Sequence, residues 1–315
     1  MKPGFTKQVF SFSIDPMWLV FALFGHLMNA FVFLTDKAFV EKIFPSPKAL
    51  AFISVASGIF TFALFPWFLT GGPSDAVFAS IFSGAITVVA LVFFFTAVGR
   101  DEISRVVPAT GSLTPISTFL LSYFLLGERF DVNILVAFSL LAFGGIIIGF
   151  RSFWSLFRKK DFSLFGLELF VAFLFAVGFV TQKYGFNGLE SDFSSFLWAR
   201  AGGVLAALPL LFYSDVRARL SFSEIRLGGA KKGLFYVVSR IFSGISPLMI
   251  TVAISFGSAT LVNATQGVQY IFLYLLAILF SRRFPDIFKE ELDRAVVFQK
   301  SIALVLIVIG LILVS

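Results

Sequence analysis

Residues 76–98 read AVFASIFSGAITVVALVFFFTAV, 23 consecutive positions without a charged side chain. A helix that crosses the roughly 30 Å hydrocarbon core of a bilayer needs about 20 mostly apolar residues. This stretch is long enough, and it is apolar on all sides rather than along one stripe. A transmembrane β-strand would be about half as long and would alternate between apolar and polar residues. The stretch therefore predicts a membrane-spanning helix.

The whole chain shares this composition. Of its 315 residues, 58% are hydrophobic and 14% are charged, and the mean hydropathy is +0.95. Soluble globular domains carry about 25% charged residues, so soluble, disordered, collagen-like and coiled-coil classes are excluded. The chain has no cysteine and one histidine, His26. This excludes disulfides, thiolate metal sites and multi-histidine metal sites, and we expect no metal and no cofactor.

Reading outward for similar stretches gives ten, and the connections between them are too short to fold as domains. The predicted fold is therefore an all-α polytopic membrane protein with ten transmembrane helices. The ten stretches are 17–35, 49–70, 76–98, 103–126, 132–150, 164–184, 194–213, 233–254, 258–280 and 296–314.

The two halves of the chain are similar to each other. Residues 33–37 (FLTDK) match 179–183 (FVTQK), and residues 106–110 (VVPAT) match 261–265 (LVNAT). Each half holds five stretches, and an odd number forces the two repeats to run in opposite directions through the membrane. The predicted organisation is a first five-helix repeat at 17–150, a basic linker at 151–163 and a second five-helix repeat at 164–314.

The basic residues predict an orientation. Ten spans place both termini on one side, where only Lys2, Lys7, Arg129 and Lys183 lie, and the opposite side carries 19 lysines and arginines. By the positive-inside rule the richer side faces the cytoplasm, so both termini are extracytoplasmic in the cytoplasmic membrane. The net charge of +7 accordingly indicates orientation and lipid contact rather than a nucleic-acid partner.

Short motifs indicate a family. Residues 108–115 (PATGSLTP) lead through an apolar run to 126–129 (LGER), residues 36–37 (DK) end the first stretch, and residues 262–267 (VNATQG) lie in the ninth. With ten spans in two inverted repeats, these resemble the drug/metabolite transporter superfamily, in its EamA-like branch. The resemblance implies a carrier that moves small organic solutes, usually outward, by alternating access. It also implies a cavity formed by spans 1, 3, 4, 6, 8 and 9, and termini in the cytoplasm, which differs from the orientation that the charges predict.

Carriers built from inverted repeats bind substrate near the midplane, often at interrupted helices. Pro115 lies near the middle of the fourth stretch and frees the carbonyl of Gly111, so we expect a hinge there, with a second at Pro247 in the eighth. A packing kink between helices is the alternative for the fourth stretch.

The ninth stretch carries Asn263, Gln266 and Tyr270 at helical spacing on one face, with Gln269 on its flank. Unpaired amides are costly in hydrocarbon, so this face meets ligand, water or protein. We expect it to line the cavity, and interhelical hydrogen bonds are the alternative.

Two arginines, Arg240 and Arg200, lie within about 5 Å of the centres of their stretches. A central charge costs at least about 2.5–3.5 kcal/mol on insertion scales, so such residues usually face a polar interior. Either guanidinium could bind a carboxylate or phosphate bidentately. The alternatives are an ion pair, for which Glu168 is a candidate partner of Arg240, or snorkelling.

His26 lies at the centre of the first stretch with Asn29 on the same face. Its near-neutral titration makes it a candidate for proton coupling, and cavity lining or a structural hydrogen bond are the alternatives. Gly145 and Gly149 form a GxxxG pair, which fits a packing seam within the chain or a homodimer surface.

Together these features predict a transporter of small organic metabolites, including amino acids and other anionic or zwitterionic solutes, that acts as an exporter. Its partners would be the small-molecule substrate and the lipid bilayer. The two arginines would also suit a flippase for a phosphate-bearing lipid carrier. A membrane enzyme is disfavoured, because acids are not clustered within the spans.

Overall fold

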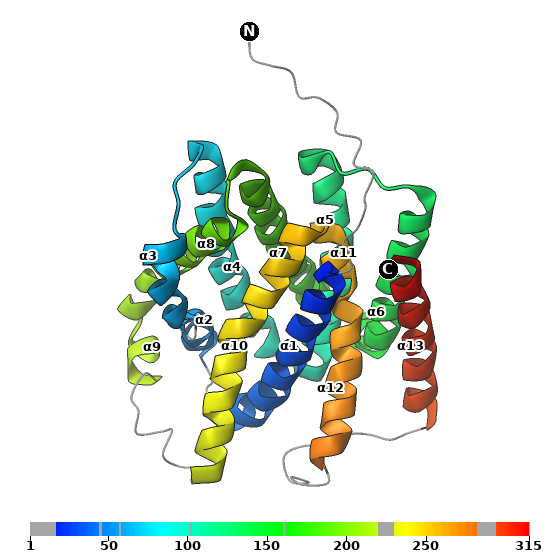
Figure 1. The fold of residues 1–315 in the computed structure, drawn as a ribbon. Coiled ribbons are helices and arrows are strands. Elements are labelled where there is room, and N and C mark those ends of the chain that lie inside the picture. Colours follow the sequence, from blue (N-terminus) through cyan, green and yellow to red (C-terminus); the bar gives the residue numbers. More distant parts are fainter. Residues whose placement is uncertain are drawn as a thin grey trace.

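The computed structural model describes residues 17–43, 46–56, 58–100, 103–159, 162–219, 230–281 and 294–314. Within these ranges all the regular structure is helical, which confirms the all-α class (Figure 1). The helices are α1 (Met17–Ile43), α2 (Pro47–Ala56), η1 (Ile59–Leu64), α3 (Phe65–Phe68), α4 (Ser74–Val98), α5 (Ile103–Leu121), η2 (Ser122–Leu126), α6 (Val132–Lys159), α7 (Phe162–Gly188), α8 (Asp192–Ala207), η3 (Leu208–Phe212), α9 (Ser214–Arg219), α10 (Ala230–Phe256), α11 (Ala259–Ala264), α12 (Gln266–Ser281) and α13 (Arg294–Val314).

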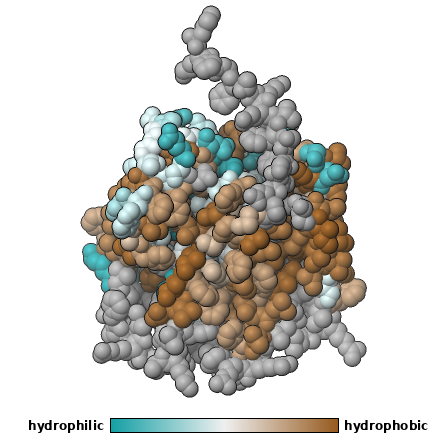
Figure 2. Space-filling view, in the orientation of Figure 1, coloured by the Kyte–Doolittle hydropathy of each residue, from teal (hydrophilic) through white to brown (hydrophobic). Residues whose placement is uncertain are grey.

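The described helical segments include seven that are long and apolar enough to cross a bilayer. They are Met17–Thr35, Pro47–Phe68, Ser74–Val98, Val106–Leu126, Phe162–Gly188, Phe193–Phe212 and Val237–Phe256. Val132–Ile147 and Ser301–Leu313 are shorter apolar helices. The face seen in Figure 2 is hydrophobic across its middle, with hydrophilic residues gathered toward the upper end. Large side chains such as Trp67, Phe124 and Phe212 are exposed, as lipid contact requires. The chain is a multi-pass helical membrane protein.

A turn interrupts the ninth stretch, and the helix of the fourth stretch is continuous at its prolines. Helix α5 continues through Pro108 and Pro115, whereas α11 and α12 are separated by a turn at Thr265. The Thr265 hydroxyl donates to the Val262 carbonyl at 2.7 Å and so competes with the helical backbone bond. In α5 the Ser112 hydroxyl lies within hydrogen-bond distance of the carbonyls of Pro108, one turn earlier, and of Gly145 in α6, and so links the two helices.

Other boundaries differ from the prediction for local reasons. The second stretch divides into α2, η1 and α3, and the seventh into α8 and η3, with a proline at the start of α3 and of η3. Proline cannot donate a backbone hydrogen bond, and 3₁₀ turns are common where an α-helix ends. The predicted linker is helical through Lys159, where α6 ends, and α7 begins at Phe162.

The long helices pack in pairs taken from both halves of the chain. Helix α1 packs against α10 and α12, α7 packs against α4 and α5, and α6 packs against α13. Glycines allow close approach: a Cβ atom on Gly84 of α4 would lie 1.7 Å from the Ala199 carbonyl oxygen of α8. Helix association in lipid relies on such close packing, because lipid supplies no hydrophobic drive.

Helices α1 and α7 run in opposite directions. Trp18, at the start of α1, lies against Gly257 at the end of α10, and Lys183, near the end of α7, bonds to the same residue. In Figure 1 the first turn of α1 and the last turn of α13 are both at the upper ends of their helices, so these two ends face the same side.

Candidate functional site

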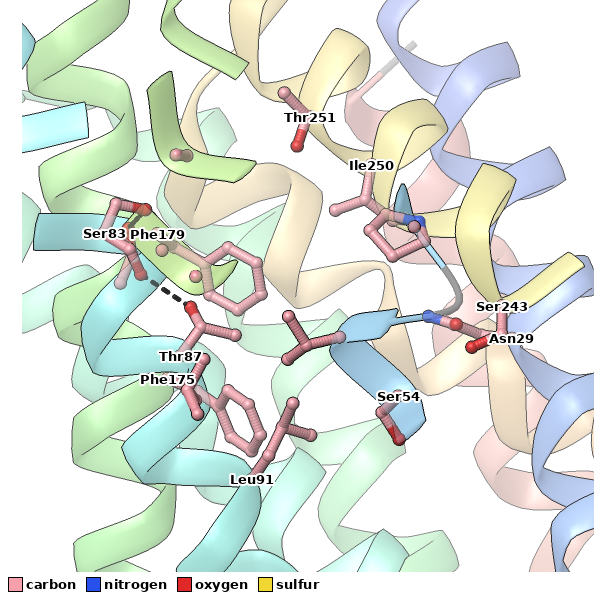
Figure 3. A pocket seen from close by; sticks show the side chains of 18 of the residues that line it. Asn29, Ser54, Ser83, Thr87, Leu91, Phe175, Phe179, Ser243, Ile250 and Thr251 are labelled. Carbon is pink, nitrogen blue, oxygen red and sulfur yellow. Dashed lines mark hydrogen bonds between the residues drawn. The ribbon is translucent and has the colours of Figure 1, made fainter. Parts of the chain in front are cut away.

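A cavity of about 310 Å³ lies between α1, α2, α4, α5, α7, α8, α10 and α12 (Figure 3). It therefore involves two segments, α2 and α8, that the family resemblance did not include. Phe175 and Phe179 of α7 project into it opposite Asn29 of α1 and Ser243 of α10. Its other polar lining includes Ser54, Ser83, Thr87, Thr110, Thr114 and Thr251.

Arg200 is the charged side chain on this cavity within the described ranges. It extends from α8, where Ala199 is held against Gly84, and its guanidinium lies 4.9 Å from the centre of the Phe196 ring. Gly58, at the start of η1, leaves room for it, since a Cβ atom there would lie 3.0 Å from Arg200 Nη1. The buried Nη2 has no hydrogen-bond partner among the described residues. Arg200 thus brings a positive charge to the wall of the cavity.

Two amides that line the cavity have one end fixed and the other open. The Gln182 Oε1 atom accepts from the Ser83 hydroxyl at 3.0 Å, and Gln269 Oε1 lies 3.3 Å from His26 Nδ1. The Nε2 atoms of both glutamines are buried and without a partner in the part of the chain that the structure describes. Both glutamines therefore contribute polar groups to the cavity wall, with the carbonyl end of each amide fixed by a neighbouring side chain.

The predicted site residues divide into two groups. Those on the cavity are Arg200, Asn29, Gln266, Gln269, Gly111 and Pro247. Those that are not among its described lining residues are Arg240, His26, Asn263, Tyr270 and Pro115. The hydrogen bonds of the second group explain much of this division.

His26 links α1 to the interrupted helix. Its Nε2 atom lies 3.1 Å from Thr265 Oγ1 and 3.4 Å from the Val262 carbonyl oxygen, and its Nδ1 atom contacts Gln269. The ring is buried and bonded on both sides of the turn between α11 and α12. Among the alternatives that the sequence left open, this geometry favours the structural hydrogen bond.

Tyr270 and Asn263 are satisfied by backbone groups. The Tyr270 hydroxyl donates to the Val107 carbonyl at 3.0 Å, and Asn263 Nδ2 donates to the Ala259 carbonyl at 2.8 Å. Gly111 is required beside Tyr270, because a Cβ atom there would lie 1.6 Å from the tyrosine oxygen. The face of the ninth stretch thus combines an interhelical bond with cavity contacts made by Gln266 and Gln269.

Arg240 lies where α10 meets α1. Its Nη2 donates to Ser239 Oγ at 3.3 Å, and Ser239 accepts from Thr35 of α1 at 2.8 Å. Its candidate partner Glu168 is buried on α7. Gly145 faces inward, because its carbonyl accepts from Ser112 Oγ at 2.9 Å and a Cβ atom built on it would lie about 4 Å from Gly267 Cα, so it forms a packing seam within the chain.

A polar cluster joins several helices at the end of the molecule where α7 and α10 finish. Gly127 has φ 69°, the left-handed conformation that ends the helix before it, and the following Glu128 accepts from Ser258 at 3.0 Å and Thr260 at 3.1 Å. Lys183 donates to the Ile254 and Gly257 carbonyls at 2.8 and 2.7 Å. Burial raises the pKa of Glu128, against the lowering effect of these hydroxyls and of Lys183. Lys37, which matches Lys183 in the repeated segments 33–37 and 179–183, has a side chain outside the described residues.

The prediction missed Gln182, Ser83 and the two phenylalanines of α7. Gln182 stands beside Lys183 in the repeated 179–183 segment, and Ser83 and Thr87 are polar residues one turn apart in a highly apolar helix. Those polar positions were a usable signal. The phenylalanines were not, because the chain contains 46 of them.

Fold and cavity define the class: a multi-pass helical membrane protein with an internal polar cavity. No family model matches the sequence, and no curated protein matches it. Among solved structures, 24 chains match. One, described only as a crystal structure of a protein, has a TM-score of 0.64 at 16% identity and covers 96% of this chain and 97% of its own. That structural similarity extends over the whole fold, and it gives no information about function.

Proposed function

We propose that the protein is a carrier that moves small organic solutes across the cytoplasmic membrane by alternating access, as an exporter of the drug/metabolite transporter type. The observation that carries the proposal is the cavity between helices of both halves, which Arg200, Gln182 and Gln269 line together with several hydroxyl groups. Ionisable groups within membrane spans usually mark a substrate pathway.

The helix packing supports two inverted five-helix repeats. Under the predicted correspondence, α1 is equivalent to α7, α4 to α10 and α5 to the α11–α12 pair. The pairing of α1 with α10 then corresponds to that of α7 with α4, and α1 with α12 corresponds to α7 with α5. A two-fold axis relating antiparallel repeats produces such exchanged pairs, and carriers of this kind bind at the repeat interface.

Alternating access needs an end that can open. The polar cluster formed by Glu128, Lys183, Ser258 and Thr260 joins the α5–α6 turn, α7, α10 and α11 at one end. Ile254, whose carbonyl accepts from Lys183, also lines the cavity. In the proposed cycle this cluster breaks when the cavity opens toward that side. From the distribution of basic residues, that side is extracytoplasmic.

Counterflow into liposomes tests the proposal. Purified protein is reconstituted, and a panel of labelled organic acids, amines and neutral solutes is screened for accumulation against protein-free liposomes. We expect at least one solute to accumulate, and Thr251→Trp, which fills the cavity, to abolish its accumulation. Ile302→Trp is the matched control, since Ile302 is exposed on α13. Accumulation of no solute, or undiminished accumulation by Thr251→Trp, would contradict the proposal. Accumulation confined to phosphate-bearing lipids would favour the flippase.

A further inference from the structure

The charge of the cavity restricts its ligand. Arg200 contributes one positive charge, and the described lining residues include no aspartate, glutamate or lysine. A buried charge needs a partner of opposite sign, because isolated burial costs several kcal/mol. An amine would find no carboxylate among the described lining residues and would be repelled by the guanidinium. A neutral solute would leave the arginine uncompensated.

The number of charges also distinguishes among anions. A phosphate monoester carries about −1.5 to −2 at neutral pH, so one guanidinium would leave part of that charge unbalanced. A single carboxylate is matched, and its two oxygens accept the paired donors of a guanidinium. Arg200 brings the guanidinium to this cavity.

The remaining lining fits the uncharged body of such a ligand. Phe175 and Phe179 of α7 line the cavity, and their rings face its interior (Figure 3). Gln182 and Gln269 also line it and add polar groups without charge. Ser83, which fixes Gln182, is adjacent to Gly84, which contacts the residue before Arg200, so amide and guanidinium are supported by one turn of α4.

We propose that the cavity binds an organic monocarboxylate, with its carboxylate on Arg200 and its apolar body against the phenylalanines of α7. The proposal rests on the carrier function for its physiological meaning, but binding can be measured independently of transport.

The test is calorimetric titration of the full chain in nanodiscs with five probes that share a phenyl group. They are phenylacetate, phenylacetamide, phenethylamine, phenylalanine and phenyl phosphate, and hexanoate adds an aliphatic body. We expect phenylacetate or hexanoate to bind at least tenfold more tightly than the amide, the amine, the zwitterion and the phosphate, because a charge-assisted hydrogen bond contributes about that much.

Variants of the arginine complete the test. Arg200→Gln is expected to weaken carboxylate binding at least tenfold, and Arg200→Lys to restore part of it, because lysine keeps the charge but loses the planar pair of donors. Arg217→Gln is the control, since Arg217 is exposed on α9. If Arg200→Gln does not fold, the order of probe affinities measured on the unmodified chain still tests the monocarboxylate proposal.

The outcomes separate the two proposals. If the amide, amine, zwitterion or phosphate binds as tightly as the carboxylates or more tightly, the monocarboxylate proposal is overturned. If that same solute also shows counterflow, the carrier proposal still stands. Carboxylate binding that depends on Arg200, without counterflow of any solute, supports the monocarboxylate and overturns the carrier. Neither binding nor counterflow overturns both.

Discussion

The contact between α4 and α8 holds Arg200 in the cavity, and a single methyl group tests it. In Gly84→Ala the new Cβ atom would lie 1.7 Å from the Ala199 carbonyl oxygen, whereas real Cβ atoms essentially never lie within 3.0 Å of such an atom. The two backbones must therefore separate locally by at least about 1.3 Å, the difference between these distances. Backbone atoms cannot rotate away as a side chain would, so helix α8 and Arg200 must shift.

The expected cost follows from overpacking. Inserted methylenes in a packed interior typically cost about 1–3 kcal/mol, while alanine in place of a helical glycine gains up to about 1 kcal/mol. Gly166→Ala on α7 is the matched control, because its Cβ atom would meet nothing within 4 Å and only the gain applies. We expect Gly84→Ala to be about 1–3 kcal/mol less stable than Gly166→Ala.

The assay is SDS-titrated unfolding in mixed micelles, followed by circular dichroism, together with phenylacetate binding. A double-mutant cycle adds a second criterion: a Cβ atom on Gly202 would lie 1.9 Å from the Ile81 carbonyl oxygen in the same contact. One separation relieves both clashes, so the combined cost of Gly84→Ala and Gly202→Ala should be less than the sum. Stability of Gly84→Ala within about 0.5 kcal/mol of the control, or strict additivity, would refute the close contact.

Arg240→Gln should retain carboxylate binding within about twofold in the same calorimetric titration, because Arg240 is not among the described lining residues; a tenfold loss would place it in the site. Gly111→Ala should displace the Tyr270 hydroxyl and cost about 1–3 kcal/mol in SDS unfolding, but less in a Tyr270→Phe background, and equal costs would argue against the contact. Because burial raises the pKa of Glu128, the folded protein binds that proton more tightly than the unfolded chain. The resulting stabilisation is complete below the ordinary carboxyl pKa and is lost as pH rises through the raised value, so Tm measured across this window should fall less steeply with pH in Glu128→Gln. A reporter fused after Ser315 should be extracytoplasmic, and a cytoplasmic signal would reverse the orientation derived from the basic residues.

The sequence alone determined the class of protein. Spanning length and hydropathy are properties of continuous segments, so the all-α membrane class follows without knowledge of which helices are neighbours, and seven of the described segments are long and apolar enough to span. It also identified Arg200, Gln266 and Gln269 as polar groups that a bilayer would not tolerate unpaired. Composition was sufficient for these conclusions because the bilayer imposes its requirement on every residue of a span.

Only the tertiary structure distinguished Arg200 from Arg240. The two arginines are equally deep in their segments. Arg200 lines the cavity, whereas Arg240 donates to Ser239 near α1. The difference depends on which helices pack beside each arginine. The structure likewise revealed a turn at Thr265, whose hydroxyl donates to the Val262 carbonyl, and a helix that is continuous at Pro115. Gln182 and the phenylalanines of α7 joined the site for the same reason: a cavity is formed between helices, and its shape depends on contacts between residues that are distant in the chain.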